Sequence, residues 1–366
     1  MKILVTNFHL KDGGGHKTYI NYLFNFLINK KFEVFLACPK SSHLYILLKK
    51  QYPDRVFNVE FPTKPREIFN ILRNISNLRR IIFSLDVDIV HVNGSPDHKI
   101  IGLLKWLFKS TFKIIRTKHD SFPIRGGYIN SKLYSSYTDK MIVVSNFQFD
   151  EVVINPSLRR RTTVIQNGID VNYFKPMAVN ENLRNFYNIR KKDIVFVSSA
   201  GTAEHKGWSF LNEAIKELDK AHRERIKVLV IGNKPTPDRL KDVSLENFIF
   251  TGYVDDTRPI VSLADVGFVL SYKVETISYA CREMMAMAKP MIVSNFAGLP
   301  ENVDNEINGW IVDTSNIDSI VQVLIRILST SIESHSIKAR RKSLESFDIV
   351  DKNLTLLDIY KELIKK

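Results

Sequence analysis

The sequence predicts an α/β protein made of two Rossmann-like domains that face a cleft. Two observations lead to this prediction. The chain opens with a short apolar run, a glycine turn, a periodic helix and a second apolar run, which is how a doubly wound βαβ unit begins. The same alternation starts again after the polar stretch 170–190, and 366 residues suffice for two domains of ordinary size.

The first domain begins with a strand at Lys2–Thr6, whose β-branched and apolar residues are typical of a buried parallel strand. Gly13-Gly14-Gly15 is expected to form a turn, and the helix expected at His16–Asn29 carries apolar residues on one face. The next strand is expected at Phe32–Cys38. The other strands expected in this domain are Ile89–Val92, Lys113–Thr117, Lys140–Ser145 and Thr163–Asn167, and the helices are Arg66–Leu85, His98–Phe108 and Asn146–Ile154.

The segment Asp170–Arg190 is polar and irregular, as expected of a linker. The second domain is expected to contain strands at Asp193–Ser198, Ile226–Ile231, Phe248–Thr251, Val266–Leu270 and Met291–Ser294, with helices at Gly207–Arg223 and Thr257–Ala264, a helix that carries Glu283, helices from Asp318 onward, and a separate amphipathic helix at Asn353–Lys366. We therefore divide the chain into a first domain (1–172), a linker (173–190), a second domain (191–348) and a final helix (349–366).

Composition indicates a globular protein of a reducing compartment. Hydrophobic residues make up 44% of the chain and charged residues 25%. The two cysteines have no metal-ligand spacing and are too few for a disulfide framework. Because the start is too short an apolar run for a signal peptide, and no stretch is long enough to span a membrane, we expect a cytoplasmic location.

The positive charge is concentrated in the first half of the chain. Residues 1–170 contain 26 Lys and Arg against 13 Asp and Glu, whereas residues 171–366 contain 27 against 26. This asymmetry favours contact between the first domain and a polyanion or the anionic inner face of a membrane. The helix Arg66–Leu85 and the segment Lys99–Lys113, with Trp106 and Phe108 among its lysines, are the candidates for membrane contact. A basic surface that is merely solvated is the alternative.

Two glutamates near a helix start are the most informative feature of the second half. Residues eight apart on one helix point about 80° away from each other, so Glu275 and Glu283 cannot both face one atom from a continuous helix. We therefore expect Glu275 on the preceding loop and Glu283 two turns inside the helix. The helix N-terminus between them would favour an anion such as a pyrophosphate, and the carboxylates would suit the hydroxyls of a nucleotide sugar.

The chain resembles the retaining nucleotide-sugar glycosyltransferases of the GT-B fold, usually called family 4. Four stretches carry this resemblance in the family's order and spacing: the glycine loop Gly13–Gly15, the inter-domain signature IQNGIDVNYFKP at Ile165–Pro176, Glu275 and Glu283 with seven residues between them, and AGLPE at Ala297–Glu301. The resemblance implies a second domain that binds the donor, a first domain that binds the acceptor, and a final helix that crosses back to the first domain.

The resemblance also implies roles for individual residues. His119 matches the family's active-site histidine near the 6-position of the donor sugar, although a structural histidine is the alternative. Glu275 matches the glutamate that contacts the sugar hydroxyls, and Glu283 the one that holds the ribose. The other donor-binding residues are Gly14 and Gly15 of the glycine loop, the base-binding turn Gly252, Tyr253 and Val254, and Thr276, Ile277 and Ser278 before the helix.

Lys206 is expected to neutralise the diphosphate, because it stands between a strand end and a helix start. With His119 and Glu275 it completes the candidate catalytic set. The family pairs this lysine with an arginine, but here Thr202 occupies that place. Arg258 and Arg282 are candidates to replace the missing charge, and a helix-surface role is the alternative for each. The usual Gly-Phe-Gly after the first glutamate is Thr-Ile-Ser here, so we expect a donor pocket of different shape.

No cofactor or metal is expected. The Asp86-Val87-Asp88 sequence resembles a metal-binding Asp-x-Asp, but it precedes a strand of the first domain and is interpreted as a strand edge. The predicted activity is transfer of a sugar from a nucleoside-diphosphate donor to a saccharide or lipid-linked acceptor. A nucleotide-sugar epimerase of the same fold is the enzymatic alternative. Nucleic-acid binding is disfavoured, since the basic residues are not interleaved with aromatics in a recognised module.

Overall fold

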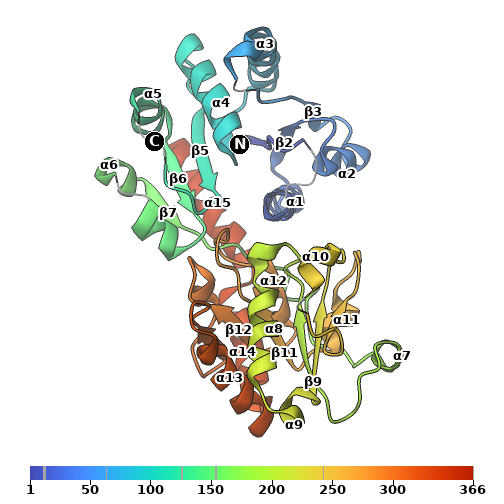
Figure 1. Ribbon diagram of the computed structural model, residues 1–366. Helices are drawn as coiled ribbons and strands as arrows, with labels where there is room; N and C mark the ends of the chain where they lie inside the picture. Colours follow the sequence, from blue (N-terminus) through green and yellow to red (C-terminus); the bar gives the residue numbers. More distant parts are fainter. Residues whose placement is uncertain (11–13, 63, 125–126, 153–154, 242, 366) are drawn as a thin grey trace. The chain divides into compact units, whose positions relative to one another are not determined.

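The computed structural model describes residues 1–10, 14–62, 64–124, 127–152, 155–241 and 243–365 (Figure 1). Gly13 of the glycine loop, Ile154 at an expected helix end and Lys366 lie outside the described residues. Backbone contacts divide the chain into two compact units. Unit 1 comprises Met1–Asn167 and Val350–Lys366, and unit 2 comprises Gly168–Ile349. The boundary between Asn167 and Gly168 falls inside the inter-domain signature.

Unit 1 contains a parallel sheet in the order β3-β2-β1-β4-β5-β6-β7. Its strands are β1 (Lys2–Thr6), β2 (Glu33–Cys38), β3 (Val56–Asn58), β4 (Ile89–Val92), β5 (Lys113–Lys118), β6 (Lys140–Val143) and β7 (Thr162–Val164). Its helical segments are α1 (Gly15–Asn29), α2 (His43–Gln51), η1 (Pro65–Glu67), α3 (Ile68–Leu85), α4 (Ser95–Phe108), α5 (Tyr128–Lys132), η2 (Leu133–Tyr137), η3 (Gln148–Val152), α6 (Pro156–Arg159) and α15 (Ile349–Lys365).

The last helix packs with unit 1, as the resemblance implies. Val90 and Val92 of β4 belong to the hydrophobic cluster beneath α3 and α4. His91 lies between them and therefore faces the opposite side of the sheet. There its Nδ1 bonds to the hydroxyl of Tyr360, a fully buried residue of α15, and its Nε2 bonds to Thr117 Oγ1 at 2.7 Å. This polar contact and the burial of Leu356 and Leu357 fix α15 to the sheet.

Unit 2 contains a second parallel sheet, in the order β10-β9-β8-β11-β12-β13. Its strands are β8 (Ile194–Ser198), β9 (Ile226–Val230), β10 (Phe248–Phe250), β11 (Val266–Val269), β12 (Met291–Ser294) and β13 (Gly309–Val312). Its helical segments are α7 (Glu181–Phe186), η4 (Glu204–Lys206), α8 (Trp208–Glu217), α9 (Lys220–Arg223), α10 (Pro237–Leu240), α11 (Arg258–Ser262), α12 (Tyr279–Ala286), η5 (Leu299–Asn302), α13 (Ile317–Ser329) and α14 (Glu333–Ser346). These two parallel sheets confirm the predicted fold class.

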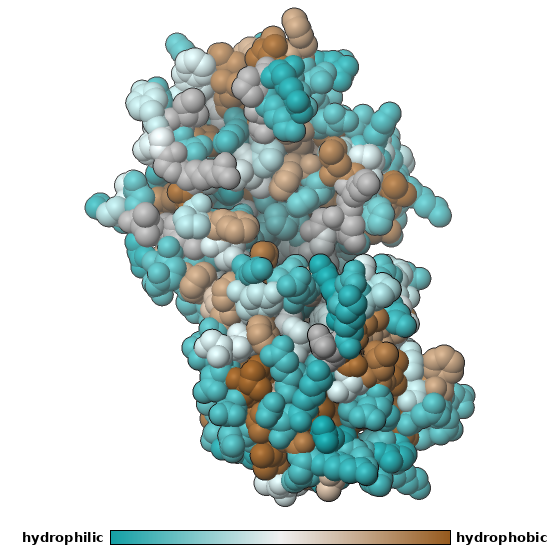
Figure 2. All heavy atoms as spheres, viewed as in Figure 1, coloured by the Kyte–Doolittle hydropathy of each residue, from teal (hydrophilic) through white to brown (hydrophobic). Residues whose placement is uncertain are grey.

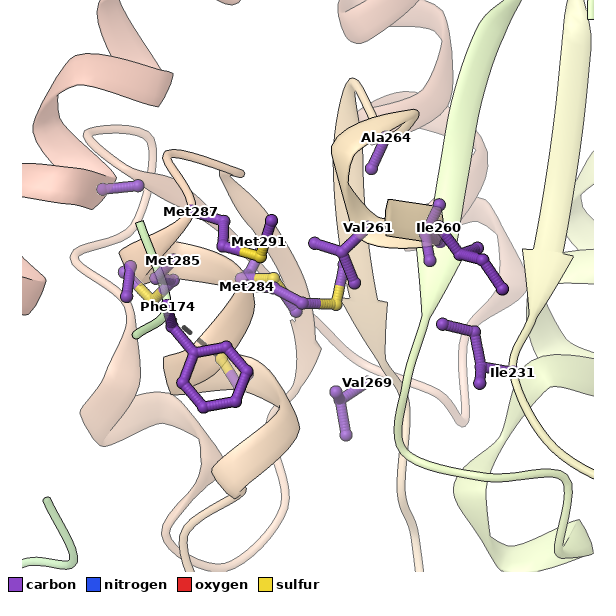
Figure 3. Packing of buried hydrophobic residues seen from close by; sticks show 14 of the residues in the cluster. Phe174, Ile231, Ile260, Val261, Ala264, Val269, Met284, Met285, Met287 and Met291 are labelled. Carbon is purple, nitrogen blue, oxygen red and sulfur yellow. Dashed lines mark hydrogen bonds between the residues drawn. The ribbon is translucent and has the colours of Figure 1, made fainter. Parts of the chain in front are cut away.

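Both faces of the second sheet are buried. Val195 and Val197 of β8 pack into one hydrophobic cluster, whereas Phe196 between them packs into another. The first cluster is rich in methionine: Figure 3 shows Met284 and Met285 of α12 within it, together with Phe174 from the segment before α7. Because both faces are covered, polar side chains on these strands can reach water only near the strand ends.

Two sequence expectations in unit 2 are wrong. The helix expected at Gly207–Arg223 is two helices, because Leu218 has an extended backbone and the Asp219 side chain caps α9 by accepting a hydrogen bond from His222 N. The segment 170–190 contains α7, and its apolar side chains Val171, Phe174 and Ile189 are buried in the core of unit 2. The mostly polar composition of this segment gave no indication that these three side chains are buried.

Other differences concern short elements and helix ends. The helix expected at Asn146–Ile154 begins at Asn146 and continues as a π-helical turn over Gln148–Val152 in the described residues. Helix α15 begins at Ile349 rather than Asn353. The elements without a sequence prediction include α2, β3, α5, η2, α6, α10 and β13. Most of them are too short to show a periodic pattern.

Hydrophilic residues dominate the surface in Figure 2, and hydrophobic patches reach it over α3 and α4 of unit 1. The exposed apolar side chains there include Phe69 and Trp106, which are 83% and 53% exposed. Within the described part of the chain, none of the helices combines the length and the apolar character that a membrane crossing requires.

Unit 1 also buries several histidines in the neutral form. Burial lowers the pKa of His91 to about 3, and burial together with the neighbouring His9 lowers the pKa of His16 to about 4. Burial lowers the pKa of His98 and His119 well below the ordinary value, and the charge of Arg116 acts in the same direction on both. These side chains stay uncharged in the folded unit while they titrate normally in the unfolded chain.

These histidines predict that unit 1 loses stability as the pH falls from 6.5 to 5. The unfolded chain then binds protons that the folded unit does not, so each buried histidine lowers the free energy of unfolding by up to about 1.4 kcal/mol per pH unit. Hydrogen-exchange protection of β4 and β5 amides, corrected for intrinsic exchange, should fall in this window. The same loss is expected in a His43→Gln variant, since His43 is exposed. Protection independent of pH would contradict this account.

Candidate active site

The predicted donor residues of unit 2 gather at the carboxyl edge of its sheet. Lys206 follows β8, and Glu275 follows the adjacent strand β11. The order of the strands reverses between β8 and β11, because the chain proceeds from β8 to β9 on one side and returns to β11 on the other. Open α/β sheets bind ligands at this kind of switch point.

Lys206 and Glu275 contact each other directly. Lys206 Nζ lies 3.0 Å from Glu275 Oε2, and the two side chains are 21% and 11% exposed. Ser271 Oγ, at the end of the strand, donates a longer hydrogen bond of 3.4 Å to the same oxygen. Two of the three predicted catalytic residues thus form one partly buried ion pair, 69 residues apart in the sequence.

Gly207 holds the Lys206 loop against β11. Its φ is +75°, and an added Cβ would lie 1.9 Å from the carbonyl oxygen of Leu270. Tyr272 N also donates a hydrogen bond of 3.1 Å to His205 O. Only glycine permits this close approach, which brings Lys206 to the strand end that carries Glu275.

The helix after Glu275 is short and capped. The Ser278 hydroxyl accepts a hydrogen bond from Cys281 N, and Ile277 is buried beneath the helix start. Glu275 therefore lies on the preceding loop, as predicted. Glu283, however, is the fifth residue of α12, little more than one turn inside rather than two.

The Glu283 carboxylate is a partly buried acid without a partner among the described residues. No hydrogen bond or ion pair to it occurs among the described residues. The loss of hydration raises its pKa to about 7, although part of the side chain remains accessible. An unpaired carboxylate in such surroundings is costly, and hydroxyl groups of a ligand would offset that cost.

The predicted base-binding turn is joined to the neighbouring strand ends. Gly252 has a φ of +81°, and its carbonyl accepts a hydrogen bond of 3.1 Å from Gly232 N after β9. Thr202 Oγ1 in the Lys206 loop donates a bond of 2.7 Å to Asn233 O. Tyr253 is 77% exposed, whereas Val254 packs against the core. The ends of β8, β9 and β10 therefore meet in one region.

The two arginines considered as replacements for the missing charge have structural contacts. Arg282 is fully buried, donates from Nε to Asn302 Oδ1 at 2.8 Å and lies over the Phe347 ring. Its alternative interpretation as a surface residue is therefore wrong. Arg258 pairs with Asp256 at 2.7 Å and stacks on Tyr173 at 3.6 Å.

The predicted residues of unit 1 form a second group, described separately because it belongs to the other unit. His119 follows β5, and its Nε2–H donates to Asn93 Oδ1 at 3.1 Å. The Asn93 orientation is fixed because its Nδ2 donates to Thr6 O. The rings of His16 and Tyr19, both on α1, lie 4.4 and 4.6 Å from that of His119.

The described glycines of the loop stand at the start of α1. Gly14 has a φ of +52° and precedes the helix, and Gly15 is its first residue. Because His16 follows at once and contacts His119, the helix start and the histidine belong to one site at the carboxyl edge of the sheet. Helix starts of this kind favour anions.

Two basic residues at the end of β5 precede His119. Arg116 and Lys118 are only 2% and 3% exposed. Asn93, directly after β4, and Asp97, in the first turn of α4, are also buried and were not predicted as site residues. Their position at or just after the carboxyl ends of strands in a sheet covered on both faces was the available signal.

No cluster of three or more His, Cys, Asp or Glu side chains suited to a metal occurs among the residues that the structure describes. The two aspartates of the Asp86-Val87-Asp88 sequence instead make structural contacts at the start of β4. Asp88 Oδ2 accepts a hydrogen bond of 2.7 Å from Lys2 N, and Asp86 ends α3 with a φ of +52°.

Comparisons with known proteins assign this arrangement to a family. The family model "Glycosyltransferase Family 4" matches residues 13–173, and the model "Glycosyl transferases group 1" matches residues 191–330. The chain belongs to the family 4 glycosyltransferases. The resemblance noted from the sequence is thereby confirmed, and both units are covered by it.

Two curated relatives are glycosyltransferases with named substrates or products. The UDP-Gal:alpha-D-GlcNAc-diphosphoundecaprenol alpha-1,3-galactosyltransferase of Escherichia coli is 25% identical over 364 residues, which cover 93% of this chain and 92% of that protein. Lipopolysaccharide 1,2-N-acetylglucosaminetransferase of Salmonella typhimurium is 26% identical over 197 residues, covering 50% of this chain and 51% of its own.

Solved structures confirm the GT-B fold. A glycosyltransferase from Rickettsia africae has a TM-score of 0.85 at 22% identity and covers 100% of this chain and 99% of its own. HepE from Anabaena, solved in complex with UDP, has a TM-score of 0.82 at 15% identity and covers 99% of this chain and 100% of its own.

The geometry at Gly207 predicts that Gly207→Ala destabilises unit 2 by about 2–4 kcal/mol. The added methyl group would meet the Leu270 carbonyl, and the left-handed backbone would add strain. Gly252→Ala is the matched control: its φ is also positive, but nothing lies within 4 Å of the added atom, so about 1 kcal/mol is expected. Urea unfolding of both variants would measure the difference, and equal losses would contradict the close-approach argument.

Proposed function

We propose that the protein is a retaining, metal-independent glycosyltransferase that moves a sugar from a nucleoside-diphosphate donor to a saccharide or lipid-linked acceptor in cell-surface glycan biosynthesis. The ion pair of Lys206 and Glu275 at the switch point of unit 2 is the observation that carries the proposal. The names of relatives support the substrate class, since they act in lipopolysaccharide or diphosphoundecaprenol-linked assembly. HepE has been solved with UDP-glucose, which supports a nucleotide-sugar donor.

Unit 2 would hold the donor at the carboxyl edge of its sheet. Glu283 would accept hydrogen bonds from the ribose hydroxyls, which gives its unpaired carboxylate partners. The turn at Gly252 would contact the base, and the loop Thr276–Ser278 with the start of α12 would face the diphosphate. The Lys206 ammonium would exchange part of its contact with Glu275 for a phosphate oxygen, which frees the carboxylate to bind sugar hydroxyls.

The reaction would proceed by ionisation of the bond between the sugar and the diphosphate. The diphosphate leaves with the electron pair, and Lys206 with the α12 start stabilises its negative charge. The sugar passes through an oxocarbenium-like state, and the acceptor hydroxyl attacks from the face that the diphosphate leaves. The acceptor proton then passes to a phosphate oxygen. We assign no side chain as a covalent nucleophile.

Unit 1 would supply the acceptor side of the reaction. His119, held by Asn93 with its proton on Nε2, would lie near the 6-position of the donor sugar, and the start of α1 would contribute amide donors. Because the imidazole is neutral, it would donate or accept hydrogen bonds without a charge. We place the protein in the cytoplasm, in peripheral contact with the inner face of the membrane through unit 1.

A donor panel tests the proposal. The purified protein is incubated with UDP- and GDP-sugars and a membrane extract, with EDTA present, and release of nucleoside diphosphate is followed together with the anomeric configuration of the product by NMR. We expect transfer with retention. Lys206→Ala should lower the turnover about 100- to 1,000-fold, because one charge on the leaving group is lost.

Lys273→Ala is the matched control for the lysine variant, since Lys273 is exposed and belongs to the neighbouring loop. Its turnover should equal that of the wild type. Inversion of the anomeric centre would overturn the retaining mechanism. Epimerised donor without any transfer would favour the epimerase alternative, and salt-sensitive DNA binding without any response to nucleotide sugars would favour nucleic-acid binding.

The raised pKa of Glu283 predicts that donor binding strengthens with pH. Ribose hydroxyls bind the ionised carboxylate better than the protonated acid, so the dissociation constant of UDP-glucose should fall about tenfold between pH 6 and pH 8. The titration uses UDP-glucose rather than UDP, because the diphosphate of UDP-glucose does not titrate in this pH range. Isothermal titration should show a flat, weaker profile for Glu283→Gln. Glu213→Gln, on the exposed face of α8, should retain the wild-type profile.

A further inference from the structure

Unit 1 contains a cavity of about 350 Å³ beside the carboxyl ends of β4 and β5. Its wall includes Arg116 and Lys118 from β5, Ser95 and Lys99 from α4, and Asp120 after β5. None of these residues is among the predicted site residues. The whole cavity lies within unit 1.

Arg116 is the unusual member of this wall. Its guanidinium donates from Nη1 to Gly94 O at 2.9 Å and to His98 Nδ1 at 3.0 Å, and from Nη2 to Ser95 Oγ at 3.1 Å. All three acceptors are neutral, because burial keeps His98 uncharged by lowering its pKa. Within the described residues no carboxylate lies within 4 Å, and the buried Nε has no hydrogen-bond partner.

A buried guanidinium that has no carboxylate partner lowers the stability of the folded protein unless an anion binds to it. Asp97 is close enough for its charge to interact with that of Arg116, but it pairs with Thr6 Oγ1 and Asn93 N instead. Burial also raises the pKa of Asp97, which makes it a poorer counter-ion. The cavity is therefore the place from which a partner for Arg116 can come.

The rest of the wall has the charge that an anion requires. Lys118 is buried and pairs with Asp120, and Gln148 Nε2 holds the same loop by donating to Asp120 O at 2.7 Å. Lys99 is exposed at the rim. Three cations and one carboxylate leave the wall with a net charge of +2. It also includes Ser95, the first residue of the 14-residue helix α4, where backbone amides favour anions.

An apolar groove continues from this cavity along α4. Its volume is about 300 Å³, and Lys99 and Leu133 line both spaces. The groove is otherwise formed mainly by apolar and aromatic side chains from α4, α5 and η2, namely Leu103, Trp106, Tyr128 and Tyr137. At Gly102 an added Cβ would lie 2.1 Å from Leu133 Cδ1, so glycine lets η2 approach α4 and close one wall.

Two other lysines of the same region contact Asp139 instead of lining either space. Lys105 Nζ lies 2.8 Å from Asp139 Oδ2, and Lys113 Nζ lies 3.7 Å from its Oδ1. These two lysines share one carboxylate, which offsets one of their two positive charges. Arg116, Lys118 and Lys99 line the cavity, and Lys132 lines the groove beside it.

We propose that this cavity and groove bind one amphiphilic molecule, with a phosphate or diphosphate in the cavity and its hydrocarbon chain in the groove. As the acceptor of the reaction it would be a saccharide attached to a lipid through a diphosphate. The role of this amphiphile as the acceptor rests on the proposed function, whereas its binding to the cavity and groove does not. Charge complementarity at one end, and continuity with an apolar groove at the other, select this class over a free phosphate or a free lipid.

Farnesyl diphosphate, inorganic pyrophosphate and farnesol are the probes for a binding test by isothermal titration, independent of transfer. Farnesyl diphosphate should bind at least tenfold more tightly than either fragment. Lys99→Ala should weaken farnesyl diphosphate and pyrophosphate about tenfold and leave farnesol unchanged. Trp106→Ala should weaken farnesyl diphosphate and farnesol about tenfold and leave pyrophosphate unchanged.

Two exposed residues that line neither space provide the controls. Lys109→Ala removes an exposed charge at the end of α4, and Phe69→Ser removes an exposed aromatic ring on α3. Both should bind all three probes as the wild type does. Arg116→Met is informative only where circular dichroism shows native folding; in that case it should abolish pyrophosphate binding.

Equal affinity for farnesyl diphosphate and pyrophosphate would overturn the proposal. Equal changes in affinity in the site variants and in the control variants would also overturn it. The outcome is separable from that of the proposed function. Transfer to soluble saccharides without farnesyl diphosphate binding would overturn this inference alone. Specific binding of farnesyl diphosphate, without transfer from any nucleotide sugar, would overturn the proposed function, whereas the proposed binding site would stand.

Discussion

Both faces of each sheet are covered by packed side chains, and this burial decides where charged groups can lie. In unit 2, alternate residues of β8 enter two separate hydrophobic clusters, and in unit 1, β4 places valines on one face and His91 against α15 on the other. A charge cannot remain inside such a layer without a partner. The carboxyl ends of the strands are therefore the places where lysines, arginines and glutamates meet one another and a ligand.

The charged groups at these ends are satisfied to different degrees. Lys206 has Glu275 and Lys118 has Asp120, so each cation has a carboxylate. Arg116 has only neutral acceptors, and Glu283 has no partner among the described residues. The satisfied pairs position the loops, whereas the two unsatisfied groups mark the places where ligand atoms would complete the structure. They lie in different units, which fits a donor and an acceptor bound by separate domains.

The sequence predicted the layout of the fold because the long strands and helices show strong periodicity. It could not predict β13, α10 or the break between α8 and α9, since each depends on only a few residues and on caps such as Asp219. The polar composition of 170–190 also gave no indication that Phe174 is part of the core. In the site, the spacing of Glu275 and Glu283 correctly predicted that one lies on a loop and the other on a helix.

By itself, the sequence determined the family, the two-sheet fold and the identity of the residues at the strand ends, because these follow from local pattern and motif order. Only the tertiary structure decided how those residues pair. Lys206 meets Glu275 across 69 residues because Gly207 allows the loop to approach Leu270, a contact that no local pattern encodes. The same holds for Arg116: arginines are mostly exposed in folded proteins, but this one is buried. Its burial beside a cavity arises from the packing of α4, η2 and β5 against one another.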